Sequence, residues 1–379
     1  MKQFIHNIQL LALMAGLVLL YTACNKDDDG GTPLVSYVRV MDPASADSLL
    51  IGAGQGNMVA IIGENLGKAK EVWFNDQKAY LVPTYITSTS IITVVPSNIP
   101  ENISNTMRII FSNGYVLSHP FETQISKPTM SSMFSEYVAE GEVATIRGNY
   151  FYEPLTVTFA GGVTGELVSV KDEEIQVTVP EGAQPGQLIV KTNFGETKSN
   201  FWFRDNRNIV ISSDPFTGWW NEGFVVTDPG PEDPVKINGN YIRVHETIGS
   251  WTWKEVAGGP NYAMGDISKN IPDEAIIKPE NYNLKFEVNT LKPYNNNMIK
   301  LNFGLPNDFN NDNYLWAPPI DTKGKWQTIV IPFETLTKNF GTLTVNPDGY
   351  WTRVLFHGAG ELDADISFDN FRVVPKTLK

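Results

Sequence analysis

Residues 56–75, "GNMVAIIGENLGKAKEVWFN", align with residues 141–160, "GEVATIRGNYFYEPLTVTFA", so the chain contains the same stretch twice. Gly63 and Gly148 take the same place in the two copies, and a phenylalanine follows each of them eleven residues later. A stretch that returns at a fixed period, here about 85 residues, indicates a repeated structural module. One module used twice therefore decides the fold of this half of the chain.

The sequence downstream of each copy has the pattern of short β-strands. "IITVVP" ends at Pro96 and "IQVTVP" ends at Pro180, and each copy then closes on an alternating strand and a turn glycine. Alternating apolar and polar residues indicate half-buried strands, and the Gly and Pro residues between them indicate turns. About seven short strands in roughly 85 residues predict a small β-sandwich.

The "GxxxxIxG" opening, the "VxF" strand and the "VxVP" strand resemble the motifs of the IPT/TIG family of immunoglobulin-like domains. The resemblance covers roughly residues 33–205. It implies one immunoglobulin-like β-sandwich over residues 33–125 and a second over residues 126–205. We expect these two modules to act as a spacer, because they carry little chemistry of their own.

The N-terminus has the pattern of an export signal. It reads "MKQFIHNIQLLALMAGLVLLYTACNKDDDGG", and before Cys24 it has Lys2, an apolar core and small residues. This predicts a signal peptide over residues 1–23, since the apolar run is shorter than the ~20 residues of a membrane-spanning helix. "LYTAC" resembles a bacterial lipobox, which implies lipidation of Cys24, and residues 24–32 then form an acidic tether.

"NKDDDG" resembles the signal that sends lipoproteins of some Gram-negative gut bacteria to the outer face of the outer membrane. The alternative is a solvated acidic linker. We expect an outer-membrane lipoprotein exposed on the cell surface.

The composition argues against nucleic acid as a partner and against stabilisation by disulfide bonds. The 379 residues carry a net charge of −13 and contain no run rich in Lys or Arg, so nucleic acid is not an expected partner. Cys24 is the single cysteine, so no disulfide can form within the chain. Each domain must be stabilised by its own core.

The composition shifts after Asp205. Seven of the nine tryptophans lie beyond it, among segments such as "NLKFEVNTL" and "WQTIVIPFETL" that have the pattern of strands. Residues 206–379 therefore predict a larger β-sandwich of the jelly-roll kind, and the fold class of the whole chain is all-β. This segment is long and apolar enough that we expect it to fold alone.

"KWQTIVIPFETL" followed by "DISFDNFRVVP" resembles the jelly-roll architecture of carbohydrate-binding modules. The order of lipobox, acidic tag, immunoglobulin-like repeats and Trp-rich sandwich resembles the surface glycan-binding proteins of bacterial polysaccharide-utilisation systems. The chain resembles in particular those whose last domain binds xyloglucan or a related β-glucan, such as mixed-linkage glucan. The resemblance implies non-catalytic capture of a polysaccharide for an outer-membrane uptake system. It also implies a TonB-dependent transporter and its glycan-binding lipoprotein as partners.

Two tryptophans stand out in "GSWTWKEV", residues 249–256. If this segment is a strand, the side chains of Trp251 and Trp253 leave the sheet on the same face. Burial in the core is the default for such residues, but the polar neighbours Ser250 and Lys254 leave no other apolar face. We expect the two indoles to form a platform, because the C–H face of a sugar ring stacks on aromatic rings.

Four further aromatic residues are candidates for glycan binding. Trp219 and Trp220 are adjacent, so in an extended segment one faces the core and the other the ligand, and the sequence does not decide which. Tyr314 and Trp316 lie in "NDNYLWAPP", a polar and Pro-rich stretch where burial is less expected. Trp326 opens a strongly apolar strand and is predicted to belong to the core.

No catalytic constellation is present. The chain has no HExxH, no GxSxG and no nucleophilic cysteine, and its four histidines are scattered. We expect no enzyme, no cofactor and no metal-ligand set, while the presence of a structural calcium stays open. The alternatives are a surface adhesin that binds a protein or host glycan and, with less support, a glycoside hydrolase.

Overall fold

The computed structural model describes residues 31–45, 47–218, 222–304, 314–338 and 343–377. The chain divides into two compact units, Met1–Ser126 and Lys127–Lys379. The predicted signal peptide, Cys24 and most of the acidic tether lie outside the described residues. With 49% strand and 9% helix, the structure confirms the predicted all-β fold class. No helix within the described ranges is long and apolar enough to cross a membrane.

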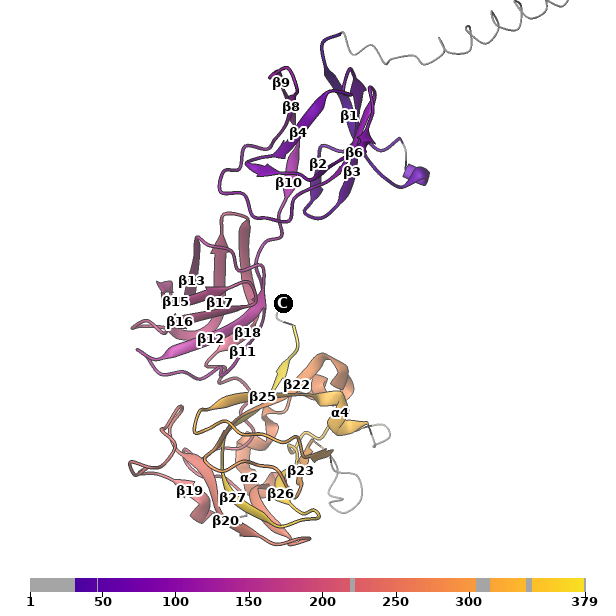
Figure 1. The fold of residues 1–379 in the computed structure, drawn as a ribbon. Helices are drawn as coiled ribbons and strands as arrows, with labels where there is room; N and C mark the ends of the chain where they lie inside the picture. Colours follow the sequence, from indigo (N-terminus) through magenta and orange to yellow (C-terminus); the bar gives the residue numbers. More distant parts are fainter. Residues whose placement is uncertain (1–30, 46, 219–221, 305–313, 339–342, 378–379) are drawn as a thin grey trace, which may run out of the picture. The chain divides into compact units, whose positions relative to one another are not determined.

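The first unit is a sandwich of two four-stranded antiparallel sheets, in the orders β1-β3-β7-β6 and β5-β4-β8-β9, with a parallel pair β2 and β10 (Figure 1). The strand bounds are β1 Leu34–Val40, β2 Gly52–Gly54, β3 Met58–Glu64, β4 Ala69–Phe74, β5 Gln77–Lys78, β6 Leu81–Ile86, β7 Ser90–Val94, β8 Thr106–Phe111, β9 Val116–Pro120 and β10 Glu122–Gln124; a 3-10 turn spans Pro43–Ser45. The apolar side chains between the sheets form one core.

The second sandwich opens the second unit and repeats this design, with sheets in the orders β11-β12-β16-β15 and β14-β13-β17-β18 around a separate core. The strand bounds are β11 Thr129–Met133, β12 Val143–Asn149, β13 Leu155–Ala160, β14 Val163–Thr164, β15 Glu166–Lys171, β16 Glu174–Thr178, β17 Gln184–Thr192 and β18 Gly195–Phe203.

Gly63 and Gly148, which take the same place in the two copies of the repeat, are required for the same physical reason. A Cβ atom on Gly63 would lie 1.9 Å from the carbonyl oxygen of Leu34, on the neighbouring strand β1. A Cβ atom on Gly148 would lie 1.9 Å from the carbonyl oxygen of Thr129, on β11. The two backbones approach too closely for any side chain, so the repeat requires glycine at this position.

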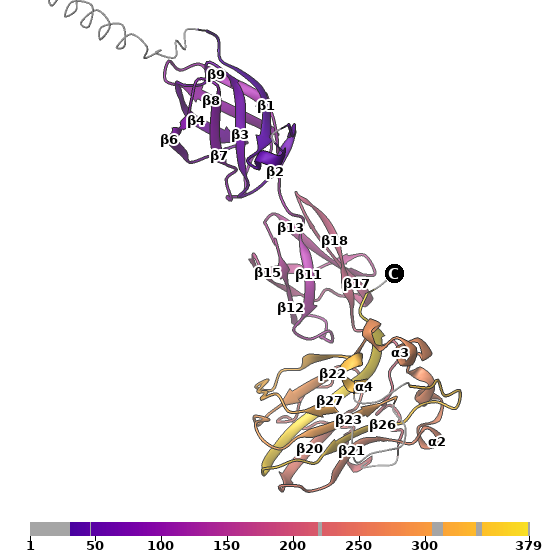
Figure 2. The same ribbon diagram turned by 90° about the vertical axis from the view of Figure 1, so that its right-hand side faces the viewer.

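The C-terminal sandwich has a five-stranded sheet, β19-β20-β27-β22-β25, and a four-stranded sheet, β21-β26-β23-β24 (Figure 2). The strand bounds are β19 Val225–Val226, β20 Tyr241–Ile248, β21 Lys254–Gly259, β22 Tyr282–Thr290, β23 Ile299–Phe303, β24 Tyr314–Trp316, β25 Gln327–Pro332, β26 Thr352–Phe356 and β27 Leu362–Pro375. The short helices are η2 Glu222–Phe224, α2 Asn261–Met264, η3 Gly265–Asn270, α3 Asp273–Ile277, η4 Pro279–Asn281 and α4 Phe333–Thr337.

Strand β27 shows how the five-stranded sheet divides its side chains. Ile366 and Phe368 enter the core between the sheets, so the alternating residues Ser367 and Asp369 lie on the other face. A β-bulge interrupts the pairing with β22 at this point, and Asn370 adopts a left-handed φ of 53°. The bulge inserts one residue, so Phe371 returns to the core.

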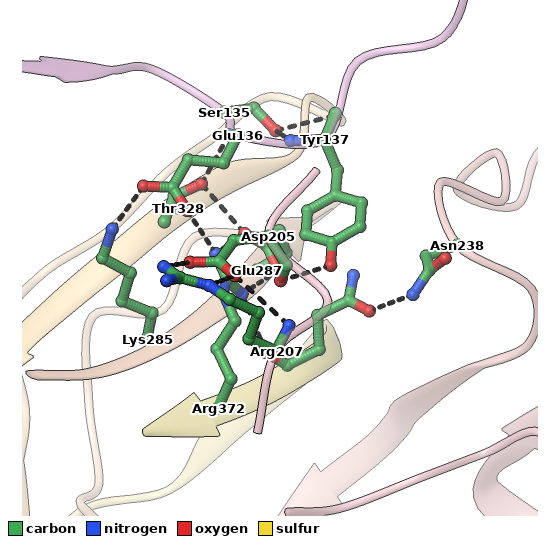
Figure 3. Close-up of polar contacts among 11 residues, drawn as sticks. Ser135, Glu136, Tyr137, Asp205, Arg207, Asn238, Lys285, Glu287, Thr328 and Arg372 are labelled. Atoms are coloured by element: carbon green, nitrogen blue, oxygen red, sulfur yellow. Dashed lines mark hydrogen bonds and ion pairs between the residues drawn. The ribbon is translucent and has the colours of Figure 1, made fainter. Parts of the chain in front are cut away.

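A buried group of charged side chains joins the second sandwich to the C-terminal sandwich (Figure 3). Glu136, just after β11, contacts Lys285 Nζ at 2.5 Å and Arg372 Nη2 at 2.6 Å. Arg372 also donates to the two carboxylate oxygens of Glu287, at 2.8 Å and 3.0 Å. All four side chains are buried, so protein rather than water neutralises each charge.

Burial and pairing together set the pKa values in this group. Burial raises the pKa of Glu287, and the charge of Arg372 lowers it in part. Burial by itself lowers the pKa of Arg372, but the carboxylates of Glu287 and Glu136 outweigh this and hold that pKa above its usual value. The guanidinium therefore stays charged and keeps the two carboxylates together.

Hydrogen bonds extend the contact between the two sandwiches. Thr328 N donates to Phe134 O at 2.9 Å, and Glu136 N donates to Thr328 Oγ1 at 2.7 Å. From the sequence, residues 126–205 are expected to be a spacer and residues 206–379 to fold alone. The two cores are separate, and Glu136 of the second sandwich pairs with two cations of the C-terminal sandwich.

Candidate functional site

Trp251 and Trp253 lie on the surface of the C-terminal sandwich, with 58% and 43% of their surface exposed. The sequence allows both to lie in a strand, but the structure instead places them in the turn that leads into β21. Trp251 has a left-handed φ of 58°, and its N–H donates to Gly358 O at 2.7 Å. The turn, and not the pleat of a sheet, therefore brings both indoles to the surface.

His357 fixes the pair from a distant part of the sequence. It directly follows β26, and its ring centroid lies 5.5 Å from that of Trp251 and 4.9 Å from that of Trp253. The interplanar angles are 67° and 59°, so the imidazole meets both indoles at an angle rather than in a stack. A single side chain therefore contacts both indoles.

Polar side chains hold the second indole in place. Trp253 Nε1 donates to Glu255 Oε1 at 2.9 Å, and Glu255 forms an ion pair with Arg353, whose Nε donates to Glu255 Oε2 at 2.8 Å. The guanidinium of Arg353 lies 5.0 Å and the ammonium of Lys300 lies 5.7 Å from the Trp253 ring centroid. Both cations can attract the ring electrostatically, so the indole is held on several sides.

These polar residues share one face of the four-stranded sheet. Glu255 on β21 and Lys300 on β23 are both paired with Leu355 on β26, and Lys300 is also paired with Leu315 on β24. Directly opposed residues of antiparallel strands lie on the same face. Burial lowers the pKa of Lys300, and the neighbouring charge of Arg353 lowers it further. The face beside the indoles thus carries hydrogen-bonding groups, and Leu315 is an exposed apolar residue on it.

The structure does not bring all the predicted residues to this face. Trp316 is only 3% exposed and lies in the core, where its ring stacks on Tyr294 at 5.4 Å. Tyr314 is half-buried against the same core, because residues two apart on β24 point the same way. The expectation that this stretch escapes burial is therefore corrected, and Leu315 is the residue of β24 that faces out.

Two predicted residues, Trp219 and Trp220, lie outside the described residues. Trp326 is buried, as expected, but on the outer face of the five-stranded sheet, where its Nε1 donates to Val235 O at 2.8 Å. No local pattern pointed to Arg353 or His357, because about a hundred residues separate them from the indoles that they contact.

The arrangement has the chemistry of a sugar-binding surface. Two exposed and fixed indoles offer apolar faces, and the cations and the carboxylate beside them offer hydrogen bonds at the edge. Such a pairing of aromatic surface with a few fixed polar groups is typical of ligand sites.

Comparison with known proteins finds a family model that matches the C-terminal sandwich. Residues 203–375 match the family model of the surface glycan-binding protein B xyloglucan binding domain. An IPT/TIG domain-containing protein of Bacteroides ovatus is 33% identical over 278 residues, which is 65% of this chain and 55% of that protein. The chain therefore spans about half the length of this relative.

Two solved structures resemble nearly the whole chain. The surface glycan-binding protein PbSGBP-B from Prevotella bryantii has a TM-score of 0.70 at 25% identity, covering 92% of this chain and 99% of that one. SGBP-B from a complex xyloglucan utilization locus in Bacteroides uniformis has a TM-score of 0.50 at 18% identity, covering 91% and 100%, and is a likeness of fold. The match to PbSGBP-B, which is named a surface glycan-binding protein, agrees with the resemblance stated from the sequence.

Proposed function

We propose that this protein captures a β-glucan, xyloglucan or mixed-linkage glucan, without cleaving it. The Trp251–Trp253 surface of the C-terminal sandwich forms the site. The bound polysaccharide then passes to an outer-membrane uptake system. Support comes from the exposed indole pair and from the family match over residues 203–375.

The turn at Trp251 is the observation that carries the proposal. A bulky residue in the left-handed region is strained, and such strain persists only where the surroundings impose it. In this protein the left-handed backbone at Trp251 exposes a large apolar side chain to water, which lowers the stability of the fold instead of raising it. Local strain combined with an exposed aromatic side chain is the expected pattern of a binding site.

A glucan chain fits this surface for two physical reasons. The C–H face of a pyranose ring loses water when it stacks on an indole, and the two indoles can hold neighbouring parts of one chain. Hydroxyl groups at the edge of the sugar can then bond to Lys300, Arg353 or Glu255, which already lie beside Trp253. The stacking supplies affinity, and the polar edge sets the orientation of the chain.

The location and partners are part of the proposal. Acylation of Cys24 would anchor the protein in the outer membrane, and the acidic tether would direct it to the cell surface. A TonB-dependent transporter and its glycan-binding lipoprotein are the partners that would receive the polysaccharide. The lipobox-like "LYTAC" supports the anchor, and the resemblance to surface glycan-binding proteins supports the partners.

Affinity gel electrophoresis with a panel of soluble polysaccharides tests the function. We expect xyloglucan or mixed-linkage glucan to retard the protein, and we expect a Trp251→Ala, Trp253→Ala variant to run as in an empty gel. Tyr80→Ala is the matched control, because Tyr80 is 83% exposed but lies in the first unit. Release of reducing sugar would instead indicate a glycoside hydrolase, and no retardation by any glycan would favour an adhesin for protein.

A further inference from the structure

A cavity of about 440 Å³ lies on the other side of the C-terminal sandwich, away from the indoles. The segment after the second sandwich and the loop before β20 border it, and the bulge of β27 forms its floor. Its polar lining includes Ser213, Asp214, Asn238, Asp369 and Asn370. None of these residues takes part in the proposed glycan site, so the cavity needs an explanation of its own.

Asp369 is the unusual member of this lining. The residue is 8% exposed, and its Oδ1 accepts the N–H of Asn370 at 2.8 Å, whereas its Oδ2 is buried without a hydrogen-bond partner among the described residues. Burial raises the pKa of Asp369 well above its usual value, and the negative charge of Glu287 adds to this. A buried carboxylate oxygen without a partner is costly, and so calls for a ligand.

Arg372, the cation whose charge acts on Asp369, is engaged through its two terminal nitrogens. Arg372 pairs with Glu136 and Glu287, and Lys285 pairs with Glu136. Among the residues that the structure describes, neither Asp369 nor Asp214 has an ion-pair partner. The charge of Arg372 lowers the pKa of Asp369 in part, but the cavity holds two carboxylates without an ion pair among the described residues.

The other polar groups that line the cavity either offer oxygen atoms that can bind a cation or hold such oxygen atoms in place. Asp214 accepts the backbone N–H of Asn240 with both oxygens, at 3.0 Å and 2.9 Å, which fixes its carboxylate at the cavity. Asn238 donates to the side-chain oxygen of Asn370 at 2.5 Å. The described residues contain no group of three or more His, Cys, Asp or Glu side chains arranged for a metal. Any cation here would have to complete its shell with amide or hydroxyl oxygens and water.

We propose that this cavity binds a calcium ion, held by the carboxylates of Asp369 and Asp214. Calcium accepts six to eight oxygen ligands in flexible geometry and takes carboxylate, amide, hydroxyl and water oxygens alike. Magnesium demands a near-ideal octahedron, and zinc prefers nitrogen and sulfur ligands, which this cavity lacks. The ion would neutralise Asp369 next to Glu287, and so would stabilise the sheet that contacts Glu136 of the second sandwich. This inference does not depend on the glycan that the protein binds.

Thermal unfolding of the whole protein, first stripped with a chelator, tests the site. We expect millimolar calcium to raise Tm by roughly 5 °C or more if it is present at about a hundredfold excess over Kd. Asp369→Asn and Asp214→Asn should each abolish most of this rise, because each removes a charged ligand. Asp266→Asn, at a fully exposed position, should keep it.

For each variant, the quantity compared is the difference in Tm between calcium-loaded and calcium-free protein. A substitution that changes the Tm of both forms equally leaves this difference unchanged. If Asp369→Asn does not fold, Asp214→Asn carries the test, because Asp214 lies on an exposed loop. The proposal is overturned if calcium leaves Tm unchanged and isothermal titration shows no binding heat. It is also overturned if the rise survives in Asp214→Asn, or if magnesium produces an equal rise.

Discussion

Replacing Glu136 by alanine should destabilise the second unit strongly, although Glu136 lies in the second sandwich and far from the indoles. Its carboxylate is the shared partner of Lys285 and Arg372, and all three side chains are buried. Removing it leaves Lys285 without an acidic partner in the part of the chain that the structure describes. Arg372 keeps its two bonds to Glu287, which limits the loss.

The expected magnitude follows from these contacts. Removing one partner of a buried ion pair costs about 3–5 kcal/mol. We expect the lower end, about 3 kcal/mol, because Arg372 remains paired. In a unit of this size that corresponds to a fall in Tm of roughly 6–12 °C. Replacing Lys285 by methionine as well removes the unpaired charge, so the double variant should regain part of the loss.

Urea unfolding and calorimetry measure the effect, with Glu142→Ala as the matched control. Glu142 is exposed in the same segment, so its loss should change the free energy of unfolding by less than about 0.5 kcal/mol. If Glu136→Ala behaves like this control, the network is not buried in solution. If Lys285→Met adds its own full loss to that of Glu136→Ala, the two side chains do not form a pair.

Three further predictions follow from burial and charge. A fragment of residues 127–379 should unfold at a higher temperature than residues 206–379, as measured by calorimetry; equal values would show that the contact with the second sandwich adds no stability. Trp316→Ala should cost about 3–5 kcal/mol through the cavity it leaves, yet the folded fraction should still bind glycan in an affinity gel, and lost binding without lost stability would contradict this. The pKa of Asp369 is raised in the folded state, so its contribution to stability falls as pH rises from its pKa in the unfolded chain to its pKa in the folded protein. Without metal, Asp369→Asn should therefore raise Tm more at neutral pH than at about pH 4. A gain in Tm that does not depend on pH would refute the raised pKa of Asp369.

The fold could be predicted from the sequence wherever the residues that determine it lie close together in the chain. The repeated glycine, the alternation of the strands and the turn residues all act within one module, and Gly63 and Gly148 have the same close contact in both copies. The contact between the sandwiches was not predictable in this way. Glu136 looks like any surface acid until the fold places it beside Lys285 and Arg372, which are about 150 and 236 residues away.

The candidate site was predictable only in part for a similar reason. The exposed pair Trp251 and Trp253 could be singled out because polar neighbours surround them. Trp316 could not be assigned, because the choice between core and surface depends on the pleat of β24, and the adjacent Leu315 takes the outer position. His357 contacts both indoles only because β26 pairs with β21, and no short motif encodes that pairing.

Isothermal titration with a xyloglucan oligosaccharide tests the central claim most directly, with the intact protein compared with Trp251→Ala and Trp253→Ala. Removing one aromatic anchor at a binding centre costs about 2 kcal/mol or more, so each variant should bind roughly thirtyfold more weakly. Both indoles are largely exposed, so the Tm of each variant should stay within a few degrees of the parent. Full affinity in both variants, or lost affinity only together with a large fall in Tm, would contradict the proposed platform.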